Sequence, residues 1–447
     1  MRIQGKAVAV ALLAAMVFGG PSLAGERDRD QTAIREQQVQ DFEAIASNAA
    51  EESSAPDTFA PCVRGMAAGT YPCDGIDMMS HLSRADLGLS FVNDMWGWTD
   101  PQTRKDYALI GGTEGTVIVD ISAPKRPDVV GTLPAHTLDP NRPFWRDIKV
   151  FDDHMYVVSE QLLHGLQVFD LTRVRGVNGA PVVFTEDAHY GDFTAHNVNI
   201  NEDTGFLYVV GARNPDRSLN CGGGLHMVDI NDPTSPSFAG CFEEHGYIHD
   251  TQCVVYRGPD GDHRGKEICF ISNDPPDGGS AGPDFVSIVD VTDKSSPVSL
   301  ARVDYPNSGY SHQGWLTPDQ SHFLHGDELD EVSHGIGTTT RVWDVRDLDD
   351  PSLTGVFEND TTSIDHNLYT EGRVAFASNY TSGLRVYDLG RVDEGELSEI
   401  AFFDVYPEND NASFEGGTWS NFPYYRQKKI VAVSSIDRGL FVLRPRG

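Results

Sequence analysis

The sequence predicts an all-β protein, a seven-bladed β-propeller of four-stranded antiparallel blades. A phrase of alternating apolar residues occurs seven times; six copies end in Asp, before a turn that often contains Pro, and the seventh ends in Arg444. Its closing residues lie 50, 59, 61, 54, 44 and 56 residues apart, a period that suits four short strands with their turns. A four-stranded sheet cannot bury both faces alone, so blades must stack around an axis. The copies are residues 115–120, 165–170, 223–229, 285–290, 340–344, 383–388 and 439–444.

Residues 1–24 predict a cleavable secretion signal. Arg2 and Lys6 precede an apolar run from Ala7 to Phe18, and small residues follow where a signal peptidase reads the chain. The run is too short for a permanent anchor, and no later stretch reaches about 18 uninterrupted apolar residues. We therefore expect a mature protein that is secreted or periplasmic and has no transmembrane segment.

Residues 25–61 form a polar leader. Ile34, Val39, Phe42 and Ile45 recur there at roughly helical spacing, which predicts one amphipathic helix. A breaker-rich linker, Glu51–Pro56, follows it. A poorly ordered leader or a helix lying on the domain explains the pattern without any role in recognition.

The six cysteines predict disulfides, because the chain is expected to leave the cytoplasm. Proximity suggests the pairs Cys62–Cys73, Cys221–Cys241 and Cys253–Cys269. The first pair brackets a small loop in residues 62–79, before the propeller of residues 80–447. Each bridge would contribute on the order of 3 kcal/mol to stability.

The repeated phrase predicts the third strand of each blade. Its closing Asp is expected to accept hydrogen bonds from backbone N–H groups two residues on. The seventh copy ends at Arg444 and leaves no residues for an outermost strand. Segment 80–87 resembles the outer-strand segment Val298–Tyr305, so we expect it to pair with the last blade and close the ring, which hides a sheet edge.

A polar signature opens each blade and carries the candidate site. The first strand of a blade lines the axis, so equivalent positions form a ring at the channel mouth. Neutral imidazoles and carboxylates in such a ring are ligands for Zn, Fe, Cu or Mn. The copies are Asn93-Asp94, Arg146-Asp147, His196-Asn197, His249-Asp250, His312-Gln313, His366-Asn367 and Gly416-Gly417. The candidate metal ligands are therefore His196, His249, His312, His366, Asp94, Asp147 and Asp250.

Two interpretations of this ring stay open. These side chains could bond backbone groups of the next blade, where an unpaired polar group costs roughly 1–3 kcal/mol. They could instead bind a metal or a small ligand. Imidazoles more than about 5 Å from a common centre would exclude one ion bound by all four histidines at a Zn–N distance of roughly 2.0–2.1 Å.

Asp327–Glu331 places four acids in five residues, beside His325 and His334. Their oxygens could bind Ca²⁺. A solvated hairpin tip is the simpler explanation.

The composition excludes several classes of partner. With 67 acidic and 34 basic residues, the chain has a formal charge of −33 and repels nucleic acid and anionic lipid. No Gly-x-Ser-x-Gly, phosphate loop or dinucleotide fingerprint is present. An extracytoplasmic protein or a small molecule remains as partner, and we expect a monomer.

Several runs of the chain point to a known family. They are Trp145–Val150, Cys221–His226, Asp250–Tyr256, His312–Trp315, Asp365–Tyr369 and Asp437–Phe441. With these runs the chain from about Cys62 onward resembles the choice-of-anchor B family of secreted bacterial proteins, and the repeated phrase resembles the LVIVD repeat. The resemblance implies fold and export, but no reaction. Family members often continue into a surface anchor, whereas this chain ends at Gly447, directly after the final strand, which favours a freely secreted or periplasmic protein.

Two functions follow as hypotheses. The first is an exported binding module or scaffold that takes a ligand or partner at its axial face. The alternative is a metal-dependent enzyme in which the histidines hold the ion and Asp94, Asp147 or Asp250 serves as general base or extra ligand.

Overall fold

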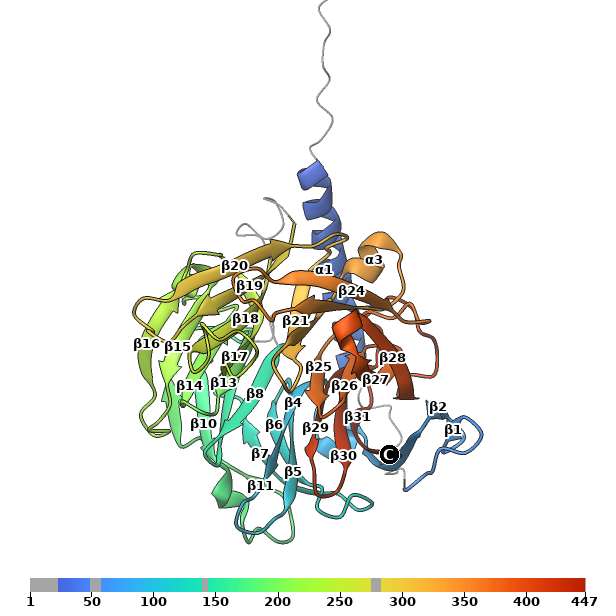
Figure 1. Ribbon diagram of the computed structural model, residues 1–447. Helices are drawn as coiled ribbons and strands as arrows, with labels where there is room; N and C mark the ends of the chain where they lie inside the picture. Colours follow the sequence, from blue (N-terminus) through green and yellow to red (C-terminus); the bar gives the residue numbers. More distant parts are fainter. Residues whose placement is uncertain (1–22, 49–57, 139–143, 275–282, 447) are drawn as a thin grey trace, which may run out of the picture.

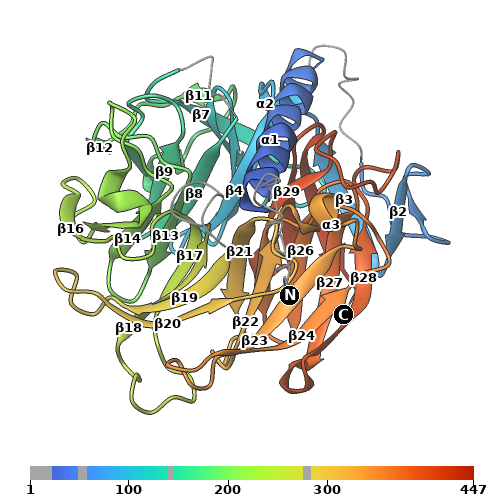
Figure 2. The same ribbon diagram turned by 90° about the horizontal axis from the view of Figure 1, so that it is seen from above.

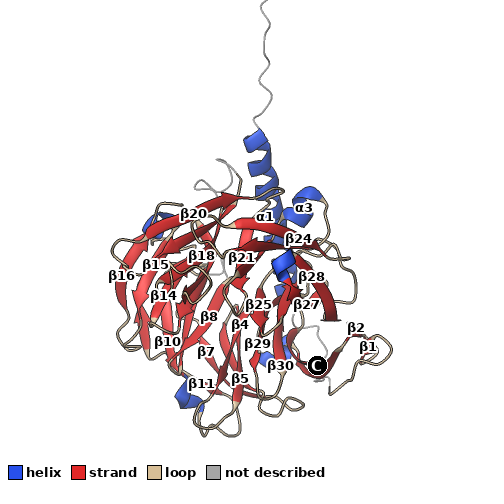
Figure 3. Cartoon of the chain, in the orientation of Figure 1, coloured by secondary structure: helices blue, strands red, loops and turns tan. Residues whose placement is uncertain are grey.

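The chain folds into the predicted seven-bladed propeller (Figures 1 and 3). The computed structural model describes residues 23–48, 58–138, 144–274 and 283–446. The secretion signal predicted in residues 1–24 lies almost entirely outside them.

Each blade runs from an inner strand at the axis to an outer strand at the rim. The innermost strands are β4 (Val92–Thr99), β8 (Arg146–Phe151), β13 (Asn197–Asn201), β17 (Ile248–Val255), β21 (Ser311–Leu316), β25 (Leu368–Glu371) and β29 (Thr418–Tyr425). The second strands are β5 (Asp106–Gly112), β9 (His154–Ser159), β14 (Phe206–Val210), β18 (Glu267–Asn273), β22 (His322–Asp327), β26 (Val374–Asn379) and β30 (Ile430–Ser435).

The repeated phrase forms the third strand of every blade. These strands are β6 (Gly115–Asp120), β10 (Leu166–Asp170), β15 (Leu225–Asp229), β19 (Phe285–Asp290), β23 (Thr339–Asp344), β27 (Gly383–Arg391) and β31 (Gly439–Pro445). The outer strands are β7 (Asp128–Pro134), β12 (Ala188–Tyr190), β16 (Ser237–Phe242), β20 (Val298–Asp304), β24 (Ser352–Glu358), β28 (Glu396–Phe403) and β3 (Ile76–Leu82).

The Asp that closes the repeated phrase shapes the turn after it, as predicted. In six blades its carboxylate accepts a hydrogen bond from the backbone N–H two residues on, at 2.8–3.0 Å. The recurring Asp is thus a turn residue. These residues are Asp120, Asp170, Asp229, Asp290, Asp344 and Asp388.

An N-terminal strand closes the ring, but it begins and ends earlier than segment 80–87. Strand β3 pairs antiparallel with β31, and Ser80 lies opposite Val442. The chain leaves the sheet at Ser83 because this residue caps the short helix α2 (Arg84–Leu87). The Ser83 hydroxyl accepts from Asp86 N–H, and the Asp86 carboxylate accepts from Ser83 N–H. This capping box satisfies both amides and ends the strand.

All three predicted disulfides are present: Cys62–Cys73, Cys221–Cys241 and Cys253–Cys269. The first holds the hairpin of β1 (Met66–Ala67) and β2 (Tyr71–Asp74), which extends a blade beyond β28. Strand β11 (Val182–Val183) extends another blade parallel to β7.

Helix α1 (Leu23–Ser47) lies across one end of the ring (Figure 2). Its Phe42 is fully buried among aromatic rings of the propeller, 4.8–6.2 Å between centroids. Arg84 also donates to the Ile45 carbonyl at 2.7 Å. None of the helices in the described part of the chain has the length and apolar character needed to traverse a bilayer.

Short helices join some of the strands. They are α3 (Asp330–His334), η2 (Leu171–Val174), η3 (Asn220–Gly223) and η4 (Val392–Glu394).

Candidate functional site

The four histidines of the polar signature lie side by side at one end of the axis. Each histidine lies at or just before the start of the inner strand of its blade. The imidazole rings of neighbouring blades are therefore adjacent. Ring centroids are 4.4 Å apart for His196 and His249, 4.2 Å for His249 and His312, and 4.3 Å for His312 and His366. The rings therefore form a continuous arc.

Hydrogen bonds fix how several rings face. The Nδ1 atom of His249 lies 2.8 Å from the His312 carbonyl oxygen, and Nδ1 of His366 lies 2.5 Å from the Trp419 carbonyl oxygen. A carbonyl only accepts, so Nδ1 carries the proton and donates it. In the neutral ring Nε2 then keeps its lone pair, which is the form that binds a metal.

Burial keeps these rings uncharged. His249, His312 and His366 are 2%, 2% and 4% exposed. Burial lowers the pKa of His249 and His312 well below the usual value, and neighbouring histidines lower it further. Burial also lowers the pKa of His366 to about 3. At neutral pH all three are therefore neutral imidazoles.

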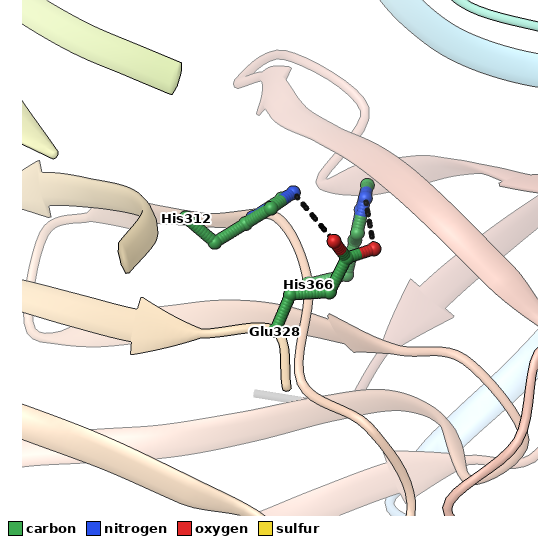
Figure 4. A group of neighbouring side chains, drawn as sticks. All are labelled: His312, Glu328 and His366. Carbon is green, nitrogen blue, oxygen red and sulfur yellow. Dashed lines mark ion pairs between the residues drawn. The ribbon is translucent and has the colours of Figure 1, made fainter. Parts of the chain in front are cut away.

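Glu328 lies between two of the histidines (Figure 4). Its Oε2 is 4.0 Å from His312 Nε2, and its Oε1 is 3.8 Å from His366 Nε2. One ligand atom from each of these three residues lies within 4.8 Å of the other two. Among the described residues the four histidines do not form one such group, so the structure brings together His312, His366 and Glu328.

Glu328 is 6% exposed and accepts from the Tyr380 hydroxyl at 3.0 Å. Its pKa is raised, chiefly by burial. A cation beside it would favour its ionised form.

His196 has a carboxylate partner of its own. Its Nδ1 lies 2.7 Å from Glu160 Oε1, in an arrangement that again places the proton on Nδ1. A carboxylate behind a histidine is a common support for a metal ligand.

The histidine arc borders a cavity of about 750 Å³. All four histidines, Glu160 and Glu328 line it, and α1 supplies part of its wall. From α1, Gln38 donates to Glu328 at 3.4 Å, Gln31 donates to the Gly309 carbonyl, and the Arg35 guanidinium lies 4.1 Å from the centre of the Tyr310 ring. The helix is thus part of the site.

The three aspartates of the signature do not join the group of His312, His366 and Glu328. Each accepts a hydrogen bond from the next backbone N–H of its own strand, at 2.6–2.7 Å. Asp147 also binds Lys149 Nζ at 2.6 Å. Burial raises the pKa of Asp250 to about 7 and that of Asp94 well above its usual value.

Polar side chains of the inner strands also tie neighbouring blades together. Asp147 accepts from Val198 N–H at 2.8 Å, Gln252 accepts from Leu316 N–H at 2.7 Å, and Asn93 donates to the Phe144 carbonyl at 2.8 Å. The two interpretations of the ring are compatible, because His249 and His366 use Nδ1 for such bonds and leave Nε2 for another partner.

Several site residues escaped sequence reasoning, namely Glu160, Glu328 and the α1 residues. Glu328 belongs to the acidic stretch Asp327–Glu331, whose interpretation as a solvated hairpin tip is wrong. The four acids of the stretch are 0–6% exposed, because the chain turns inward between β22 and α3. The acids themselves were visible in the sequence, but their burial was not.

Comparison with known proteins identifies the repeat. A model of the LVIVD repeat matches residues 104–133 and 220–243. No curated protein matches the chain. Among solved structures, the chain is similar to a crystal structure of a protein from Lactobacillus plantarum, with 13% identity, a TM-score of 0.46, and coverage of 77% of this chain and 88% of that chain.

Proposed function

We propose that the protein is a binding module whose axial cavity takes a small polar ligand through a transition metal ion. His312, His366 and Glu328 hold the ion, and His249 and His196 extend the donor arc toward the cavity. The observation that carries the proposal is the convergence of two neutral imidazoles and one carboxylate within 4.8 Å on the wall of a 750 Å³ cavity.

The donor set favours zinc. Two histidines and one carboxylate fill three of the four positions of a tetrahedral zinc ion. The fourth position stays open, as it does in zinc sites that bind water or a substrate. Related borderline ions such as Mn, Fe or Cu suit the same ligands. The ligand would then complete the coordination from the cavity side.

The proposal includes export. Three disulfides favour an oxidising compartment, and residues 1–24 have the composition of a secretion signal. The resemblance to the choice-of-anchor B family supports a secreted or periplasmic location.

Elemental analysis of protein purified without chelator tests the metal. We expect about one transition-metal ion per chain, and a loss of at least about tenfold in zinc affinity in the variant His312→Ala/His366→Ala, because two of three ligands are removed. The matched control is His334→Ala, an exposed histidine outside the arc. Substoichiometric metal that is the same in all three proteins would end the proposal.

Cobalt substitution tests the open position. Azide should change the visible spectrum of the cobalt-loaded protein, because it would enter the coordination sphere from the cavity. An unchanged spectrum would indicate a closed, structural metal site instead.

A metal-dependent enzyme is the second candidate, and Glu160 favours it. This carboxylate lines the same cavity, lies beside His196 and is outside the group of three ligands, so it is placed to act as a general base. Chromogenic ester and phosphodiester substrates test the idea on metal-loaded protein. Turnover that falls at least about 100-fold in Glu160→Gln supports the enzyme. If the metal-loaded protein turns over no faster than the metal-free protein, the enzyme is excluded and only the binding module remains.

A further inference from the structure

A second cluster of carboxylates lies near the histidine arc and takes no part in it. Asp330 and Glu331 begin α3, and Asp365 precedes His366. Their exposures are 0%, 2% and 3%. One carboxylate oxygen from each lies within 4.8 Å of the other two, so the three groups face a common point.

Hydrogen bonds satisfy only part of this cluster. Asp330 Oδ2 accepts from Arg341 at 2.7 Å and from the Thr339 hydroxyl at 2.8 Å, and Glu331 Oε1 accepts from Thr339 N–H at 3.1 Å. The Asp330 and Glu331 carboxyls also contact each other, so a hydrogen bond between them requires a proton on one of the two. Both oxygens of Asp365 are buried without a hydrogen-bond partner. Asp365 is thus an unpaired buried carboxylate directed at two others.

The charges of the cluster do not balance. Three carboxylates face one guanidinium, that of Arg341, which pairs with Asp330. Neighbouring Asp327 adds a further negative charge near Arg341 and Asp365, although its own oxygens accept hydrogen bonds from the Tyr305 hydroxyl and from the Gly309 and Tyr310 amides. The cluster therefore has an excess of negative charge that a divalent cation would reduce.

We propose that Asp330, Glu331 and Asp365 form a calcium site. Ca²⁺ binds carboxylate oxygens at roughly 2.3–2.6 Å, so oxygens within 4.8 Å of one another can share one ion. Oxygen ligands alone, without nitrogen or sulfur, favour such a hard cation over the borderline ions that suit the histidine arc. This proposal goes beyond the axial site and does not depend on it.

The position of the cluster gives the ion a structural consequence. Asp365 is adjacent to His366, and Asp330 lies two residues after Glu328. An ion held by Asp330, Glu331 and Asp365 would therefore fix both segments that carry ligands of the axial site. The Asp365 carboxylate also packs against Gly326 in β22, where a side chain would collide with it.

Protons are the competing occupant. Burial, followed by repulsion from neighbouring carboxylates, raises the pKa of Asp330 to about 6 and those of Glu331 and Asp365 well above their usual values. If the three acids are protonated, they carry no charge that a cation must balance, and the protein would then not bind calcium.

Calcium titration of the full chain separates these two outcomes. The protein is incubated with EGTA under mildly denaturing conditions, since a site this buried should exchange slowly, and then refolded with or without CaCl₂. We expect one Ca²⁺ per chain by calorimetry and a rise in Tm of at least about 3 °C at saturating calcium. No binding and an identical Tm in EGTA and CaCl₂ would overturn the proposal.

Variants locate the site. Asp365→Asn and Glu331→Gln should each weaken calcium binding at least about tenfold, because each removes a charged ligand. The matched control is Asp349→Asn, an exposed acid in a different cluster with Asp260 and His263, and it should bind calcium as the wild type does. Wild-type affinity in both Asp365→Asn and Glu331→Gln would overturn the assignment.

Two further measurements keep the test decisive. Calcium-free Asp365→Asn should melt higher than the calcium-free wild type, because one repelling charge is gone, so this variant is expected to fold. A calcium-free Asp365→Asn that melts lower would contradict this charge argument. The variant His312→Ala/His366→Ala should retain calcium binding, which separates this site from the axial metal, and loss of calcium binding there would place the ion at the histidines instead.

Discussion

Single buried histidines tie the stability of this propeller to pH. His226 in β15 is 7% exposed and lies outside the axial site. Its Nδ1 lies 2.6 Å from Asn220 Oδ1, and its Nε2 lies 3.0 Å from the Tyr190 hydroxyl. Burial lowers its pKa to about 4, below the ordinary value of about 6.5.

This shift predicts a loss of stability in mild acid. Between about pH 6.5 and pH 4 the unfolded chain binds a proton at His226 that the folded chain does not, so stability falls as pH falls, by on the order of 3 kcal/mol for this group. His226→Gln should lose less stability between pH 7 and pH 4.5 than the wild type, as measured by guanidinium midpoints. His334→Gln serves as the exposed control, and equal losses in all three proteins would contradict the prediction.

At the same scale, sequence reasoning found the ring of histidines but not the residue that joins two of them. The register of the polar signature predicted the positions of His196, His249, His312 and His366 on the axis. Glu328 follows the end of a second strand, where no repeat marks it. Its role depends on the inward turn of the chain before α3, which is a tertiary effect.

At the scale of elements, helix α1 packs against the propeller and forms part of the cavity wall. The spacing of Phe42 and Ile45 suggested a helix lying on the domain, but which surface it would cover could not be read from the helix alone. The receiving surface is assembled from separate blades, in residues such as Phe91, Phe144 and Trp419.

Phe42→Ala should detach α1 without unfolding the ring. The ring of Phe42 is fully buried against the propeller, so its removal should weaken docking by about 3–5 kcal/mol. We expect faster proteolysis within residues 23–48, detected by mass spectrometry, while the Tm of the propeller stays close to that of the wild type.

Glu36→Ala is the matched control for this experiment, because Glu36 lies on the exposed side of the same helix. Equal proteolysis of the Phe42→Ala variant and the wild type would show that α1 does not depend on this contact.

The repeated phrase correctly predicted the third strands and their turns. The strand that closes the ring, in contrast, lies a few residues before the predicted segment. Segment 80–87 resembles an outer strand in its residues, yet the local capping box of Ser83 and Asp86 takes precedence over that resemblance. Strand β3 therefore lies upstream, where Ile76 and Met78 are fully buried.

At the scale of the whole molecule, one strand pair joins the two ends of the ring. Met78 in β3 lies opposite Leu443 in β31, and both are fully buried. Met78→Asp would bury a charge at this closure, at a cost of several kcal/mol. We expect a fall in Tm of at least about 10 °C, or oligomers formed through the freed edge of β31, detected by size-exclusion chromatography.

Val298→Asp is the matched control, since Val298 lies in the outer strand β20 of another blade and is 54% exposed. It should melt within about 2 °C of the wild type. A Met78→Asp protein that is monomeric and equally stable would show that the ring does not depend on this closure.

The closure also dictates when the molecule can finish folding. Asp77, beside Met78, pairs with Arg446, and 369 positions of chain separate the two. During synthesis the ribosome releases β3 long before it makes β31, so β3 has no partner strand in that interval. Contacts this distant in sequence also form slowly, because a long loop must close before they gain any energy. Completion of the ring must therefore follow synthesis of the last blade, and until then the unpaired β3 can pair with a wrong strand.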